Sequence, residues 1–231
     1  MAIAKELALD AEQLNAILST EWNMRIATLG LWDRPWIRAE YPNLPSVGAF
    51  ESSVFDPKNW KPEYPNPAFM NLQPEDAYWA AKIVMSFSDY DIRKIVRTGL
   101  LSDEQAEQYV VDTLIQRRDK IGRYWLSRML SLDNFRINGS VLQFQDLLAE
   151  YGLGKTLETV TAKWYRFDND AQQKTALLTA GQYGTNQIPL PADVLASAGS
   201  TDQFFVVEIA DRVLVFVRNN GTLQIVGIER N

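Results

Sequence analysis

The residues best suited to chemistry are two adjacent arginines, Arg117 and Arg118, in a long segment with helical periodicity. A guanidinium group can bind a phosphate or a carboxylate through two parallel hydrogen bonds. On a helix that turns about 100° per residue, both arginines lie near the edge of the apolar face. Their charges must then reach solvent or a carboxylate. We favour a structural role, in which they pair with Asp89, Asp91 or Glu75. The alternative is a site in which one of them binds an anionic ligand.

The residue types that are missing exclude several kinds of catalysis. The 231 residues include no histidine, which removes the usual general base and histidine-ligated metals. They include no cysteine, which removes disulfides, thiolate nucleophiles and zinc–sulfur sites. Catalysis would have to use carboxylates, lysine, tyrosine or a serine–lysine pair. We therefore lean against an enzyme, assign no catalytic residue and expect no metal and no cofactor.

Three short motifs look like functional sites but fit simpler roles. The stretch 152–156 ends like a phosphate-binding loop, but Ala149 stands where the motif needs its first glycine. The stretch 168–170 resembles the start of a calcium loop that lacks its glycine and closing glutamate. Asp89 and Asp91 fall in the first turn of an expected helix, where the helix dipole accounts for them. We interpret these motifs as a helix stop, a turn and a helix start.

A segment rich in proline and tryptophan spans residues 32–74 and holds eight of the ten prolines. This density of proline excludes a continuous helix or central strand. The segment is also too aromatic for a disordered linker, because buried indole rings offset the entropy cost of ordering. We expect an ordered strap that wraps over the helices. The alternative is an aromatic platform for a sugar or a peptide, with Trp36 and Trp60 as the contact residues.

Helical periodicity and capping residues predict the remaining elements of the first part of the chain. The expected helices are 10–29, 74–87, 88–99 and 101–129. Pro74 suits a first helical position, and Ser88 suits an N-cap. Ser102 and Gln105 have the spacing of a capping box.

The second part of the chain reads as β structure. Two apolar runs within 135–144 are joined by Asn138-Gly139, which predicts a tight hairpin. A short helix is expected at 145–151, and alternating or continuous apolar runs after residue 157 predict strands. We therefore predict an α+β protein with two domains. The first (1–153) is helical and includes the strap (32–74) and the hairpin; the second (154–231) is a small antiparallel β domain.

Charge and hydropathy narrow the possible partners. The net charge of −6 argues against nucleic acid as a partner. No apolar run reaches the length of a membrane span, and the first residues have no signal-peptide pattern. We therefore expect either a cytosolic protein or a piece of a longer one. The expected partner is protein, either an N-terminal region missing from this sequence or another chain, with a saccharide as the alternative.

Three stretches together resemble a known group of proteins: FDPKNWKPEYPNPAF (55–69), DAYWAAKIV (76–84) and LIQRRDKIGRYW (114–125). The chain is similar to the C-terminal region of larger, uncharacterised bacterial proteins that share this strap and the RRDKI helix. We expect those proteins to be exported. The resemblance implies an extracytoplasmic location and a missing N-terminal bulk, and it transfers no catalytic residue.

Three hypotheses of function follow from these observations. The leading hypothesis is a non-catalytic accessory or interaction module of a larger bacterial protein. The second is a carbohydrate- or peptide-binding module that uses exposed aromatic residues. The third is an enzyme based on carboxylates and arginine that a missing N-terminal domain would complete.

Overall fold

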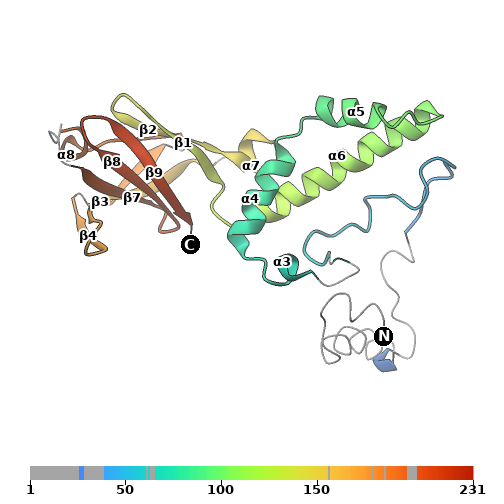
Figure 1. Cartoon of the computed structure of the whole chain (residues 1–231), viewed down its shortest axis with the longest axis horizontal. Helices are drawn as coiled ribbons and strands as arrows, with labels where there is room; N and C mark the ends of the chain where they lie inside the picture. Colours follow the sequence, from blue (N-terminus) through green and yellow to red (C-terminus); the bar gives the residue numbers. More distant parts are fainter. Residues whose placement is uncertain are drawn as a thin grey trace. The chain divides into compact units, whose positions relative to one another are not determined.

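The fold is that of a computed structural model, which describes residues 26–28, 39–60, 62, 66–155, 157–177, 179–184, 186–196 and 202–230. The chain divides into two compact units, residues 1–55 and 56–231. Helices come first along the chain and antiparallel sheets follow, which confirms the expected α+β class (Figure 1). The boundary expected after residue 153 stays a prediction.

In the first unit, the structure describes residues 26–28 and 39–55. Residues 26 and 27 are helical, whereas the rest of the helix expected at 10–29 lies outside the described residues, as does Trp36. Residues 39–55 form turns and bends. One of these turns is held by the buried Glu51, whose carboxylate accepts hydrogen bonds from the Val54 amide at 3.0 Å and from the Ser53 hydroxyl.

The second unit begins with four helices. They are α3 (Pro67–Met70), α4 (Pro74–Met85), α5 (Asp89–Arg97) and α6 (Glu104–Leu126). Pro74 is the first residue of α4, as predicted. Ser88 caps α5 as predicted, since its hydroxyl accepts from the Asp91 amide while Asp91 accepts from the Ser88 amide.

The start of α6 differs from the prediction. The N-cap is Asp103 and not Ser102, because the Asp103 carboxylate accepts a hydrogen bond from the Gln105 amide at 2.9 Å. An aspartate cap satisfies a free amide of the first turn and also places a negative charge at the positive end of the helix. The helix itself is confirmed.

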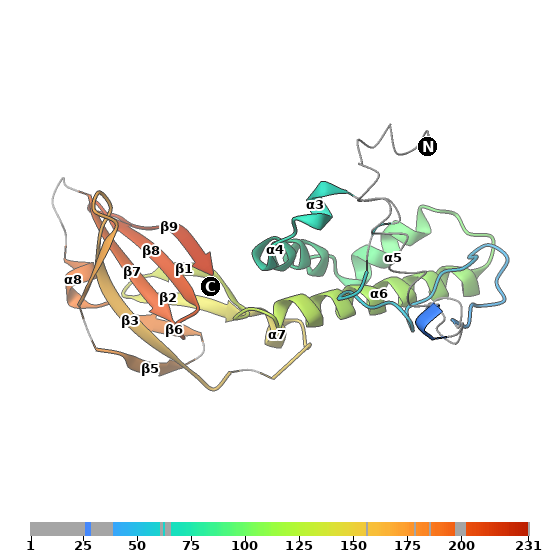
Figure 2. The ribbon, with the colours of Figure 1, turned by 90° about the horizontal axis from the view of Figure 1, so that it is seen from below.

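Helices α4 and α5 pack against the long α6 (Figures 1 and 2). Two groups of apolar side chains fill the contacts, and their buried members are Tyr78, Ala81, Met85, Leu126, Met129 and Leu147 in one and Ile92, Val96 and Val111 in the other. Gly122 of α6 lies against Met85 of α4, so closely that a Cβ atom there would collide with the Met85 side chain. The missing side chain therefore lets α4 and α6 approach.

A β-hairpin follows α6. It consists of β1 (Leu132–Asn138) and β2 (Val141–Asp146), which leads into α7 (Leu147–Glu150). The hairpin is confirmed, but its loop is Gly139-Ser140, because Asn138 still pairs with Val141. Gly139 takes the left-handed conformation (φ +59°) that this loop requires. A third strand, β6 (Gln187–Pro189), pairs with β2 and completes a three-stranded sheet.

The larger sheet is antiparallel and has the order β4-β3-β7-β8-β9, with β5 also pairing with β3. Its strands are β3 (Thr159–Asp168), β4 (Gln173–Ala176), β5 (Gly181–Gly184), β7 (Gln203–Ile209), β8 (Val213–Asn219) and β9 (Leu223–Arg230). A one-turn helix, α8 (Ala192–Leu195), precedes β7. The alternation predicted for β3 is confirmed, since Val160, Ala162 and Trp164 are buried. The short strands β5 and β6 were not predicted.

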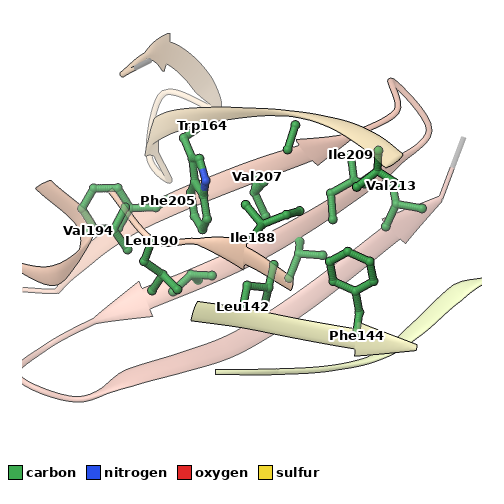
Figure 3. Close-up of a cluster of buried hydrophobic side chains, with 14 of the residues drawn as sticks. Leu142, Phe144, Trp164, Ile188, Leu190, Val194, Phe205, Val207, Ile209 and Val213 are labelled. Atoms are coloured by element: carbon green, nitrogen blue, oxygen red, sulfur yellow. The ribbon is translucent and has the colours of Figure 1, made fainter. Parts of the chain in front are cut away.

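The two sheets share one apolar core (Figure 3). Leu142 and Phe144 from the hairpin lie in it together with Trp164, Phe205 and Val207 from the larger sheet. The hairpin thus packs with the β part of the chain, whereas the sequence analysis had grouped it with the helices. Its apolar faces are buried only when the larger sheet covers them, and local sequence does not reveal this partner.

Candidate interaction surface

Arg118, the main candidate of the sequence analysis, lies where α4, α5 and α6 meet. Its guanidinium pairs with the Asp89 carboxylate of α5 at 2.8 Å and with Asp119 at 2.7 Å. It also donates a hydrogen bond to the backbone carbonyl of Phe87, which follows α4, at 2.8 Å. The pairing of Arg118 with Asp89 is therefore as predicted. The side chain fastens the α4–α5 corner to α6.

These contacts bear on what Arg118 can do chemically. Burial disfavours its charge, but the hydrogen bonds to Asp119 and Asp89 outweigh burial and raise the pKa of Arg118 above its usual value. Two carboxylates already occupy the donors that would bind an anionic ligand. The arrangement is that of a structural cation.

Three other residues singled out in the sequence are Trp60, Arg117 and Arg128. Trp60 is 52% exposed, and its ring meets Phe69 edge-on with ring centres 5.4 Å apart. Arg117 is half-buried on α6. Arg128, beyond the end of α6, lies over the Tyr124 ring and donates to its hydroxyl at 2.9 Å. Among the described residues, no hydrogen bond, ion pair or ring contact joins Trp60 to Arg118.

A second polar cluster links the helices to the sheets. The buried carboxylate of Asp133 on β1 pairs with Lys82 of α4 at 2.7 Å and with Arg230 of β9 at 3.0 Å. Arg230 also donates to the Leu130 carbonyl at 3.1 Å, and its guanidinium lies 4.4 Å from the centre of the Tyr78 ring. We call Tyr78, Lys82, Asp133 and Arg230 the polar joint.

Burial determines the ionisation state of Tyr78 in the polar joint. The Tyr78 side chain is almost fully buried, and its hydroxyl interacts with the Asp133 carboxylate without a hydrogen bond of good geometry. Removal from water raises the pKa of Tyr78 far above its ordinary value of 10.0, against the lowering effect of Arg230. The phenol is therefore neutral at physiological pH, and Asp133 is the carboxylate shared by the two cations. The joint is largely buried, with only Lys82 partly exposed, and it connects structural elements rather than forming a reaction site.

The most unusual surface of the second unit is on α4. Its inner face, which carries Tyr78 and Met85, is buried, whereas Trp79 and Ile83 on the opposite face are 64% and 44% exposed. Phe87, just past the helix end, continues the four-residue spacing and is 44% exposed. We call Trp79, Ile83 and Phe87 the outer stripe. Large apolar side chains in a row on a helix surface mark an interaction site more often than chance.

Further exposed apolar residues lie on the neighbouring helix α3. Figure 2 shows α3 beside α4, on the side of α4 opposite to α6. The exposed apolar residues of α3 and its flanks are Phe69, Met70 and Leu72. The C-terminal end of the stripe is held in place by Arg118 through the Phe87 carbonyl. Arg118 is thus a positioning residue for this surface.

The outer stripe has a signal in the sequence. Residues 75, 79, 83 and 87 are four apart, the spacing of one ridge on a continuous helix, and three of them are large and apolar. Together with the buried face, they make α4 apolar on two opposite sides. The polar joint had no such signal, because Asp133 and Arg230 are far apart along the chain.

Two other kinds of site are not found in the described residues. No group of acidic side chains there is arranged to hold a metal ion. Among the helices of the described part of the chain, none combines the length and the apolar content needed to cross a bilayer.

Comparison with known proteins assigns neither a family nor a function to the chain. No protein-family model, no curated protein and no solved structure matches the chain.

Proposed function

We propose that this protein is a non-catalytic accessory or interaction module of a larger bacterial protein and that it binds a protein partner through the outer stripe. The observation that carries this proposal is the exposure of Trp79, Ile83 and Phe87 on a helix whose opposite face is already buried. Burying a large apolar side chain stabilises a complex by about 1.5–3 kcal/mol. Three such side chains in a row supply the centre of an interface.

The polar clusters support a module rather than an enzyme. Arg118 is held by Asp89 and Asp119, and the two cations of the joint share the buried carboxylate of Asp133. Both clusters make rigid the helices that display the outer stripe. The resemblance to the C-terminal region of larger, exported bacterial proteins fits the same role and carries with it an extracytoplasmic location.

Site-specific photo-crosslinking in the producing cells tests the proposal. A photoreactive residue at position 83 should cross-link to one defined protein, which mass spectrometry identifies. The same residue at Gln173, exposed on β4, serves as the control and should not capture that protein. The adduct should disappear when Trp79→Ser is added. Equal capture from both positions, or no adduct at position 83, would refute the proposal.

A second candidate function rests on Trp60. Its indole is half exposed and lies edge-on to Phe69, and an exposed aromatic face can stack on a sugar ring or a peptide. Titration of the chain with soluble oligosaccharides should then change its tryptophan fluorescence, and Trp60→Ala should remove that change. A response that survives Trp60→Ala would exclude Trp60 as the contact.

A further inference from the structure

The charges around the outer stripe indicate what kind of partner it binds. Glu75 lies four residues before Trp79 and so heads the same helix ridge, and Asp76 follows it in the first turn of α4. At the other end, Asp89 and Asp91 occupy the first turn of α5, immediately after Phe87. The apolar row thus has exposed carboxylates at both ends.

Hydrogen bonds and an ion pair fix several of the carboxylates at these ends. Asp91 accepts hydrogen bonds from the Ser88 amide and hydroxyl, which hold the pKa of Asp91 below its ordinary value. Asp76 accepts from the Gln73 amide at 3.2 Å. Asp89 pairs with Arg118, but Arg118 also pairs with Asp119, so the carboxylates in that contact outnumber the cation.

The cations of the same two helices are directed elsewhere. Lys82 of α4 pairs with the buried Asp133 at 2.7 Å. Lys94 of α5 holds its ammonium group over the Tyr90 ring. Arg93 of α5 donates a hydrogen bond to the Gln108 side chain of α6 at 2.7 Å, and Arg97 pairs with Glu107 of α6 at 3.0 Å. The ends of the outer stripe are therefore negative.

We propose that the outer stripe binds a basic amphipathic helix of a partner protein, whose apolar face covers Trp79, Ile83 and Phe87 and whose flanking lysines or arginines face the carboxylates around Glu75 and Asp91. Anchor residues four apart are the spacing by which one helix packs along another. Opposite charges at the ends of the contact select the partner and its orientation. This inference rests on the proposed function and specifies the partner's chemistry.

Binding of designed peptides to the full chain tests the inference. The probe is a fluorescent helical peptide with leucines on one face and lysines on the other. Its twin carries glutamate in place of every lysine, and a shuffled peptide keeps the composition of the probe without its apolar face. The lysine peptide should bind at least about tenfold more tightly than either control, and this advantage should shrink as salt screens the charges.

Variants of the chain locate the binding. Ile83→Ser should abolish binding, and Glu75→Lys should weaken the lysine peptide by about tenfold while strengthening the glutamate twin. Glu104→Lys is the matched control, because Glu104 also occupies an exposed first turn, that of α6, and it should change neither. Thermal unfolding should show that all three variants fold.

Several outcomes would overturn the inference. Equal affinity for the lysine and glutamate peptides, or no effect of Glu75→Lys, would remove the charge argument. Photo-crosslinks from position 83 to a second copy, or to another part of the same chain, would show a different occupant. If position 83 instead captures a partner that lacks a basic helix, this inference fails while the interaction module stands; if it captures none, both fail.

Discussion

The guanidinium of Arg230 and the carboxylate of Asp133 lie 3.0 Å apart and join the last strand, β9, to the first strand, β1. Lys82 of α4 pairs with the same carboxylate oxygen at 2.7 Å, so one buried acid connects two strands and a helix. This contact makes the helices and the sheets of the second unit depend on each other. The outer stripe is displayed by the same helix that Asp133 holds.

Replacing Asp133 with alanine should lower the free energy of unfolding by about 3 kcal/mol, because Arg230 and Lys82 would lose their shared counter-charge in a largely buried site. Urea denaturation measures the change. The control is Asp211→Asn, which removes an exposed ion pair with Lys163 but keeps a residue type that tolerates the positive φ of this turn, and it should have a much smaller effect. Equal losses in the two variants would show that the joint contributes no more than a surface pair.

Replacing Arg118 with alanine should lower the free energy of unfolding by about 2 kcal/mol, because Asp89, Asp119 and the Phe87 carbonyl would lose a shared donor. The melting temperature should fall accordingly. Arg97→Ala, which removes a more exposed pair with Glu107, should have a much smaller effect. An unchanged melting temperature for Arg118→Ala would contradict its structural role.

Replacing Tyr78 with phenylalanine should leave stability at pH 7 unchanged or raise it by up to about 1 kcal/mol, because the buried hydroxyl makes no hydrogen bond of good geometry. The variant should differ from the parent chain at alkaline pH. Burial raises the pKa of Tyr78, so the unfolded chain loses this proton first, and stability declines as the pH rises above the ordinary value. Tyr78→Phe should remove that part of the decline.

The measurement for Tyr78 is urea denaturation of both chains at neutral pH and at pH values above 10. A large loss of stability in Tyr78→Phe at neutral pH would show that the hydroxyl is hydrogen-bonded. If the parent chain and Tyr78→Phe lose the same stability at alkaline pH, groups other than Tyr78 cause the loss.

Replacing Gly122 with alanine should destabilise the helices by about 1–3 kcal/mol, because its methyl group would collide with Met85 and crowd Leu153. An alanine elsewhere in a helix would stabilise it by up to about 1 kcal/mol, so the sign of the change is informative. Gly184→Ala is the control, since a Cβ atom there meets nothing within 4 Å. Thermal unfolding of both variants checks the prediction, and a stabilised Gly122→Ala would show that α4 and α6 are not in close contact.

Much of the local structure of the second unit could be predicted from the sequence. Pro74 and Ser88 mark helix starts because their effects act within one turn, and Gly139 marks the hairpin because its φ is positive. The errors were also local in origin. Asp103 competed with Ser102 for the cap of α6, and the hairpin loop shifted by one residue to Gly139-Ser140.

The candidate site could also be predicted only in part from the sequence. A salt bridge between Arg118 and Asp89 could be expected, because charges on an apolar face need partners and the carboxylates of the preceding helix were available. The exposure of Trp79 and Ile83 could not be expected, because an apolar residue on a helix reads as core until the packed structure shows which face is covered.

The sequence by itself determined the α+β class, the capped helices, the tight hairpin and the absence of histidine and cysteine chemistry. These properties depend on residue types and on spacings of a few residues. Only the tertiary structure decided that the hairpin joins the β core, that Asp133 meets Arg230, and that the outer stripe of α4 faces solvent. Each of these depends on contacts between segments far apart in the chain, and local periodicity carries no information about which distant surface covers a given face.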